Sequence, residues 1–184
     1  MADRLAQIVA AARELLEAQG PEAVSMRRIA DRLGIRAPSL YKHLPDKAAV
    51  EAALQAEGLA GLAEALEAAE AAWRGGSALS ALAGAYRRFA LEHPHLYRLT
   101  SDRPLARDAL PPGLEARAVA PLLRAVGGDL DVARAVWAFA HGMVLLELDG
   151  RFPPGSDLTG AWLAGATAFA VPTAKSDTSG PNPQ

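Results

Sequence analysis

The chain has 184 residues, of which 42 are Ala and 26 are Leu, whereas Val, Ile and Thr together number only 17. Ala and Leu favour helices and β-branched residues favour strands, so this composition predicts an all-helical (all-α) fold. It excludes Rossmann and P-loop enzymes, because their sheets need runs of Val and Ile. The sequence has no Cys, and only His93 and His95 among its four His are closely spaced. Disulfides and thiolate metal sites are therefore excluded, and we expect no metal and no cofactor.

The formal net charge is −2, but the charges are unevenly distributed along the chain. Residues 24–47 contain six Lys or Arg against two Asp or Glu, whereas residues 51–184 contain 11 against 15. A basic segment attached to an acidic body is typical of a contact with nucleic acid. No apolar signal segment is evident, and the most apolar stretch, 132–148, is short and contains charged residues. We therefore expect a cytoplasmic protein with no membrane partner.

Apolar residues recur three and four positions apart along most of the chain, and capping or breaking residues separate the repeats. Ser25 and Asp46 are placed to cap helices, and Gly34 to end one. The expected helices, in chain order, are 3–20, 25–33, 37–44, 46–73, 77–93, 95–101, 114–126, 130–148 and 157–171. Between them, 102–113 is expected to be a loop, and the polar tail 172–184 is expected to be disordered.

Residues 25–44 have the pattern of two short helices joined by a turn. The expected helices are separated by Gly34-Ile35-Arg36, and Ala30 is small at the point where the two helices must approach each other. Such a unit can place its second helix in the major groove of DNA. Any helical hairpin would give the same pattern, so both interpretations stay open on the residues alone.

Three groups of residues within 3–54 narrow this choice. They are Val24-Ser25-Met26-Arg27-Arg28-Ile29-Ala30, then Leu33-Gly34-Ile35, and then Ser39-Leu40-Tyr41-Lys42-His43-Leu44 with Lys47. With these residues the segment resembles the DNA-binding domain of the TetR family of transcriptional regulators, although many members have Phe where this chain has Leu44. The resemblance implies a three-helix helix-turn-helix domain over 1–46, a helical ligand-binding and dimerisation domain over 47–171, and a separate tail over 172–184.

The resemblance also sets the register for residues whose chemistry suits DNA. Phosphate contacts are expected from Ser25, Arg28, Tyr41, His43 and Lys47, and base contacts from Arg36, Ala37, Pro38, Ser39 and Lys42. Arg36 and Lys42 can donate to O6 and N7 of guanine, and Ala37 can contact a thymine methyl group. A helix N-terminus such as the one at Ser25 can bind a phosphate. For each residue the alternative is a solvated side chain with no DNA contact.

Apolar residues occupy two faces of the expected helix 130–148, which indicates burial on both sides. In TetR-like proteins the last two helices form a four-helix dimer interface, which 130–148 and 157–171 resemble; an intramolecular core is the alternative. The chain also resembles a ligand-binding subgroup of this family that has Trp and His-Gly on its penultimate helix. Two short segments carry this resemblance: His95-Leu96-Tyr97-Arg98 and Trp137-Ala138-Phe139-Ala140-His141-Gly142. An apolar ligand pocket is expected to be lined by Tyr86, Phe89, Tyr97, Trp137, His141 and Met143, unless these are ordinary core residues.

Together these patterns predict a dimeric, ligand-responsive transcriptional repressor. It would bind a near-palindromic operator in double-stranded DNA and be released by a small-molecule effector. Catalysis is not expected, because no acid/base pair or nucleophile triad is evident. The alternative is a helical small-molecule-binding or interaction protein that does not bind DNA.

Overall fold

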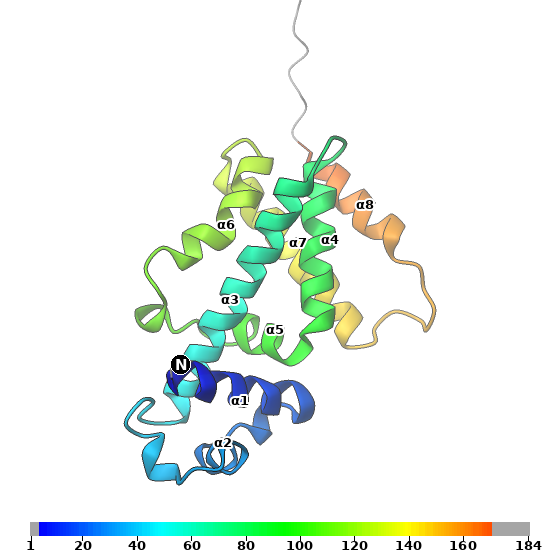
Figure 1. The fold of residues 1–184 in the computed structure, drawn as a ribbon. Coiled ribbons are helices and arrows are strands. Elements are labelled where there is room, and N and C mark those ends of the chain that lie inside the picture. Colours follow the sequence, from blue (N-terminus) through cyan, green and yellow to red (C-terminus); the bar gives the residue numbers. More distant parts are fainter. Residues whose placement is uncertain (1–3, 171–184) are drawn as a thin grey trace, which may run out of the picture.

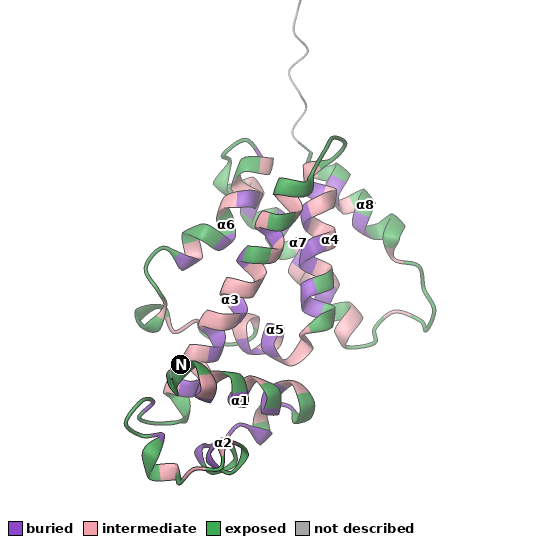
Figure 2. Cartoon of the chain, viewed as in Figure 1, coloured by how far each residue is buried: buried purple, intermediate pink, exposed green. Residues whose placement is uncertain are grey.

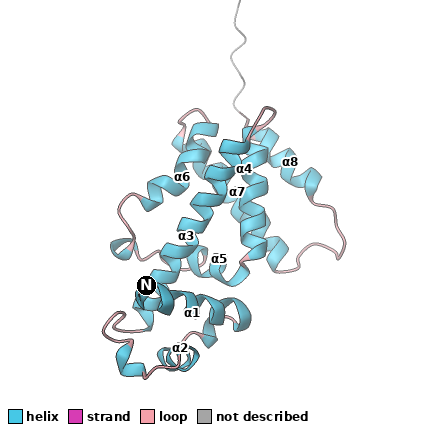
Figure 3. Ribbon diagram, in the orientation of Figure 1, coloured by secondary structure: helices cyan, strands magenta, loops and turns pink. Residues whose placement is uncertain are grey.

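The structure is a computed structural model that describes residues 4–170. These residues form eight α-helices and three short 3-10 helices, and no strand occurs among them (Figures 1 and 3). The α-helices are α1 (Arg4–Gln19), α2 (Met26–Leu33), α3 (Lys47–Ala72), α4 (Ala78–Glu92), α5 (Pro94–Ser101), α6 (Leu114–Ala125), α7 (Leu130–Leu148) and α8 (Thr159–Ala168). The 3-10 helices are η1 (Pro21–Ala23), η2 (Ala37–Ser39) and η3 (Arg107–Ala109). The all-helical fold class is therefore confirmed.

Capping residues set several helix boundaries where the sequence places them. The Ser25 hydroxyl accepts a hydrogen bond from the Arg28 N–H at 3.3 Å, and α2 ends at Gly34 with a φ of 65°. Residues with a side chain rarely adopt that φ, which explains why Gly stands there. One carboxylate oxygen of Asp46 accepts from the Ala49 N–H at 2.8 Å and so begins α3. The expected cap Asp3 lies outside the described residues.

The prediction of an α-helix over 37–44 was wrong in detail. Residues 37–39 form the 3-10 helix η2, and turns follow as far as residue 43. Their N–H groups bond mainly three residues back: Ser39 to the Arg36 oxygen at 2.9 Å and His43 to the Leu40 oxygen at 2.8 Å. Pro45 ends the segment, because Pro disfavours a helical conformation in the residue before it, here Leu44. Pro38 lies in the first turn of η2, where its missing N–H removes no helical bond.

The last helix is also shorter than the expected 157–171. Helix α8 begins at Thr159, because Asp157 is not helical and its carboxylate accepts from the Thr159 N–H at 2.9 Å. This short-range bond offers the backbone an alternative to a helical turn. Helix α8 ends at Ala168, and the expected tail 172–184 lies outside the described residues.

The N-terminal helices form a small head that is joined to a larger helical body. In Figure 1, α1 and α2 lie at the bottom, and α3 rises from the head through the middle of the body. The head's buried core includes Ile8, Leu16, Ile29, Leu40 and Leu44, and it continues through Val50 and Leu54 of α3 to Leu96 and Leu99 of α5. One hydrophobic core therefore connects the head to α3 and α5. A displacement of either helix would change the packing of this core.

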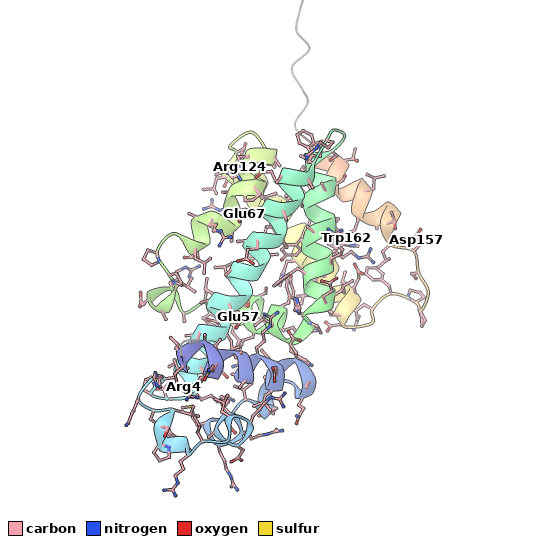
Figure 4. All side chains as sticks on the ribbon, in the orientation of Figure 1. Arg4, Glu57, Glu67, Arg124, Asp157 and Trp162 are labelled. Atoms are coloured by element: carbon pink, nitrogen blue, oxygen red, sulfur yellow. The ribbon has the colours of Figure 1, made fainter. Side chains whose placement is uncertain are left out.

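In the body, α4 and α6 pack against the upper part of α3, and α7 and α8 pack against α4. Buried residues in Figure 2 gather on the facing sides of α3, α4 and α7. Ion pairs fix α6 to α3, since Arg117 and Arg124 each donate two hydrogen bonds to Glu67 and Glu70, respectively (Glu67 and Arg124 are labelled in Figure 4). None of the described helices is both long and apolar enough to cross a membrane.

A buried carboxylate holds α4, α7 and α8 together. The Glu147 side chain is only 8% exposed, and it accepts from Arg87 at 2.7 and 2.9 Å. Its other oxygen accepts from the indole N–H of Trp162 at 2.7 Å (Trp162 is labelled in Figure 4). A charge can be buried at low cost only when it is paired and hydrogen-bonded in this way.

Candidate functional site: an exposed basic head and an apolar cavity

The predicted DNA-contacting residues lie on the surface of the head. Eight of the ten are exposed and two, Ser25 and Ala37, are half-buried. Leu40 and Leu44 anchor the segment, because both are buried in the head core. The three residues between these two anchors are exposed, including Tyr41, which is 51% exposed. The segment can therefore present polar groups to a partner without disturbing the core.

The cationic side chains of the head differ in their availability. Arg36 and Lys42 are exposed and make no side-chain hydrogen bond or ion pair within residues 4–170. Arg28 instead donates to the Gln19 amide oxygen, and the Lys47 Nζ lies 3.6 Å from a carboxylate oxygen of Glu51. Arg36 and Lys42 can thus bind a base or a phosphate without breaking a contact within the protein. Lys47, in contrast, lies near a carboxylate that competes with a phosphate for its charge.

Arg27 is a candidate that the sequence analysis did not include. Its side chain is 90% exposed, and its nearest carboxylate, that of Asp31, is 4.0 Å away. It is therefore freer than its neighbour Arg28 to reach a phosphate. A signal was present in the sequence, because Met26, Ile29 and Leu33 define the inner face of the helix and leave position 27 on the outer face.

The body contains a mostly apolar cavity of about 670 Å³. Residues of six helices, α3 to α8, line it, together with the loop 102–113; among them are Leu59, Leu62, Leu66, Leu82, Leu122 and Val136. Its size and apolar lining fit the usual range of small-molecule sites. Of the six residues predicted to line a pocket, Tyr86 and Trp137 border this cavity.

The other four predicted pocket residues lie outside the cavity lining. Phe89 packs edge-to-face against His93 with ring centroids 5.2 Å apart. Met143 packs against the core of the body. Tyr97 is 1% exposed, and its hydroxyl lies 2.7 Å from Nδ1 of His141. Their sequence pattern did not distinguish the cavity from the adjoining core, since both are apolar.

A chain of polar groups leads from the cavity into the core. The hydroxyl of the cavity residue Tyr86 lies 2.8 Å from that of Tyr97, which in turn bonds to His141. The His141 ring stacks on Trp137 with centroids 6.0 Å apart. Burial raises the pKa of Tyr97, and the neighbouring Tyr86 raises it further, so the Tyr97 hydroxyl stays protonated and can always donate.

Polar residues of the loop 102–113 also border the cavity, and the sequence pattern did not indicate them. Arg103 and Arg107 lie in the cavity lining. The buried side chain of Gln55 fixes this loop to α3: it donates to the backbone oxygens of Leu99 and Pro104 at 3.0 and 3.2 Å and accepts from the Ala106 N–H at 3.0 Å. A lone Gln on the buried face of a predicted helix was the only available signal.

The outer surface of α7 and α8 carries large apolar side chains. Trp137, Leu146 and Leu163 are 52%, 42% and 54% exposed, whereas Ala133, Val136, Ala140 and Val144 of α7 are buried. Leu163 lies on α8, beside α7. Trp137 and Leu146 are nine residues apart and so lie on opposite sides of α7, and Trp137 borders the cavity. Leu146 of α7 and Leu163 of α8 remain as exposed apolar side chains of the kind found at protein–protein contacts. Within residues 4–170, no three His, Asp or Glu side chains form a group that could hold a metal.

Both parts of the chain match known protein families. Residues 8–54 match the family described as bacterial regulatory proteins, tetR family, and residues 79–169 match the tetracyclin repressor-like C-terminal domain. An HTH-type transcriptional regulator of Mycobacterium tuberculosis is 30% identical over 152 residues, which are 78% of this chain and 69% of the relative. The chain belongs to the TetR family. These matches do not test the Trp/His-Gly subgroup, which stays a prediction.

A second relative shares only part of its length with this chain. The HTH-type transcriptional regulator YobS of Bacillus subtilis is 36% identical over 90 residues, which are 49% of this chain and 47% of YobS. The chain thus spans about half the length of that relative.

Solved structures resemble the chain over almost its full length. A protein of unknown function from Rhodococcus sp. RHA1 is 26% identical, with a TM-score of 0.74 over 92% of this chain and 94% of that one. A TetR variant from Acinetobacter baumannii AYE, solved in complex with minocycline, is 25% identical, with a TM-score of 0.59 over 92% of this chain and 93% of that one. The arrangement of head and body is therefore that of the family.

Proposed function

We propose that this protein is a dimeric, ligand-responsive repressor that binds a near-palindromic operator through residues 1–46 and a small molecule through residues 47–171. The role is regulatory rather than enzymatic. One observation carries the proposal: α3 begins at Lys47, beside the exposed basic segment, and its residues Leu59, Leu62 and Leu66 line the cavity. A ligand in the cavity therefore contacts the same rigid element that positions the head.

The exposed cations of the head support the DNA-binding part of the proposal. Arg36 and Lys42, with Ser39 between them, would read bases, while Tyr41, His43, Lys47 and Arg27 would contact phosphates. Segment 37–43 is a 3-10 helix and turns in the free protein. Its short-range bonds are compatible with a small rearrangement in the major groove, because Leu40 is buried in the head core whereas residues 38, 39 and 41–43 are exposed.

The exposed apolar surface of α7 and α8 supports a homodimer. Two copies that bury Leu146 and Leu163 against each other would place two heads at a fixed separation. Such a pair reads half-sites whose centres lie about one helical turn, roughly 34–36 Å, or slightly more apart. A ligand that prefers a different separation would lower operator affinity by the difference in its own affinity for the two states.

The decisive experiment is a mobility-shift assay with DNA from upstream of the protein's own coding region, at two salt concentrations. The proposal predicts a specific shift that resists competitor DNA and weakens steeply with salt. The alternative, a helical small-molecule-binding protein that does not bind DNA, predicts no shift at either salt concentration. Binding of random and upstream DNA with equal affinity would also overturn the repressor assignment.

A further inference from the structure

A single carboxylate connects the cavity to the head. Glu51 lies one turn into α3, and one of its oxygens accepts from the Arg103 guanidinium at 3.1 Å. Its other oxygen lies 3.6 Å from the Lys47 Nζ. Arg103 belongs to the cavity lining, whereas Lys47 is the predicted phosphate contact. A cation of the cavity lining and a cation predicted to contact DNA thus both lie near the carboxylate of Glu51.

The charged groups around the cavity are mostly positive. Three arginines, Arg103, Arg107 and Arg134, line it together with one acid, Glu115. Each arginine has a carboxylate partner: Arg107 donates to Glu115 at 3.0 Å, Arg134 to Asp131 at 2.9 Å and Arg103 to Glu51 at 3.1 Å. Of these three acids only Glu115 belongs to the lining, so the lining itself carries more positive than negative groups. A guanidinium binds a carboxylate well, because its donors form a planar fork that matches the two oxygens. An apolar interior with a positive border suits an apolar molecule with an anionic head group.

The ion pairs of Glu51 are of a kind in which one charged partner can be replaced by another. The Arg103 and Lys47 side chains are 48% and 46% exposed, and ion pairs between exposed groups are weak. The loop that carries Arg103 does not depend on Glu51 alone, because Gln55 fixes that loop through two hydrogen bonds, one to the Pro104 oxygen and one from the Ala106 N–H. Arg103 can therefore change its partner without leaving the edge of the cavity.

We propose that the effector is an apolar carboxylate, and that its carboxylate replaces Glu51 as the partner of Arg103. Glu51 then pairs with Lys47 alone, and Lys47 becomes less available to a DNA phosphate. This inference rests on the proposed function, because it identifies the ligand class and the coupling of the same cavity. It requires no change in the fold, since both exchanges occur within side-chain reach on α3 and the loop 102–113.

The ligand class is tested by titration calorimetry with decanoate, decanamide and decylamine, which share one chain length. The protein is expected to bind decanoate at least about ten-fold more tightly than the other two, as for hydrogen bonds to a charged group. Arg103→Gln should reduce that preference to less than about two-fold. The control Arg88→Gln, an exposed residue of α4 outside the cavity lining, should retain it. No carboxylate preference, or one that survives Arg103→Gln, overturns the proposal.

The coupling is tested by operator binding with and without saturating decanoate. Decanoate should lower the operator affinity of the wild-type protein at least about five-fold. Glu51→Gln should still bind decanoate but lose most of this response, whereas Glu64→Gln, an exposed residue of the same helix, should respond like the wild type. An unchanged response in Glu51→Gln overturns the coupling. A protein that binds no operator without ligand refutes the proposed function instead, while calorimetry still decides the ligand class.

Discussion

The backbone N–H of Leu96 donates a hydrogen bond to the side-chain carboxylate of Glu17 at 3.1 Å, across 79 positions of sequence. Leu96 is the third residue of α5, whose own N-cap residue, His93, makes no capping bond with its side chain. The first N–H groups of a helix lack partners within it, and a negative charge at that end is favourable. Helix α1 of the head thus provides the cap for a helix of the body.

Glu17→Ala is expected to lower the free energy of unfolding by about 1 kcal/mol, the usual effect of losing a helix cap. Glu17→Gln should lose less, because its amide oxygen can still accept the bond. Urea unfolding followed by circular dichroism measures both. Glu22→Ala, an exposed acid in the neighbouring η1, is the control and should change stability by no more than about 0.5 kcal/mol. An equal loss in both alanine variants would contradict the capping role.

Lys47→Ala and Arg36→Ala should affect DNA binding in different ways. Loss of a phosphate contact at Lys47 is expected to weaken binding to all sequences and to reduce the salt slope by about 1. Loss of a base contact at Arg36 should weaken binding to the operator by about 1–3 kcal/mol and should weaken binding to random DNA much less. Fluorescence anisotropy on both DNAs at several salt concentrations separates the two cases. Equal losses on operator and random DNA for Arg36→Ala would refute its role as a base reader.

The buried hydroxyl of Tyr97 should affect stability in a pH-dependent way. Because the pKa of Tyr97 is raised in the folded protein, its contribution is complete below about pH 10, where the unfolded chain is also protonated. Above that pH the unfolded chain ionises first, so stability falls. Tyr97→Phe is expected to cost about 1 kcal/mol at neutral pH by removing the bond to His141.

Urea unfolding near neutral pH and above about pH 10 tests the alkaline effect. Tyr97→Phe should lose less stability between the two conditions than the wild type does; some loss should persist, because burial also raises the pKa of Tyr86. Tyr41→Phe, at an exposed position, is the control and should retain the wild-type pH dependence. The same alkaline loss in Tyr97→Phe as in the wild type would contradict the prediction.

Gly165 allows α8 to approach α7 closely. A Cβ at this position would overlap the ring of Phe139, which itself packs against Trp162 and Phe169 with centroids 5.9 and 6.1 Å apart. Gly165→Ala is therefore expected to destabilise the protein by about 1–3 kcal/mol, as overpacking does. Gly160→Ala in the same helix meets nothing within 4 Å and is the control. Thermal unfolding compares the stability of the two variants. Recovery of stability in the double variant Gly165→Ala/Phe139→Leu would identify the Phe139 ring as the cause.

Leu163→Glu should separate the proposed dimer into monomers that remain helical. A charge at a buried interface costs several kcal/mol, whereas at an exposed position of a monomer it costs little. Leu91→Glu, at a residue of α4 that is 40% exposed, introduces the same charge away from this surface and should stay dimeric. Light scattering gives the mass and circular dichroism the helicity. A Leu163→Glu protein of unchanged mass and intact helicity would rule out this interface.

The sequence by itself determined those features that depend on neighbouring residues. Helix caps at Ser25 and Asp46 and the left-handed Gly34 follow from bonds within four residues, so local patterns predicted these boundaries correctly. The exposed basic head followed from charge counts and from the apolar anchors Leu40 and Leu44. Local patterns were wrong where the backbone bonds differ from those of an α-helix, as in segment 37–43 and at Asp157. They also placed four residues in the pocket that lie outside the cavity lining.

Only the tertiary structure decided which of these local elements act on one another. The Glu17 bond to Leu96 and the Arg103 bond to Glu51 join residues 79 and 52 positions apart, and no periodicity encodes such pairs. The cavity likewise depends on how six helices and the loop 102–113 pack, which is why the aromatic pattern predicted Tyr86 and Trp137 as lining residues but not Arg103. Packing is a property of several helices together, so it cannot be inferred from the spacing within one.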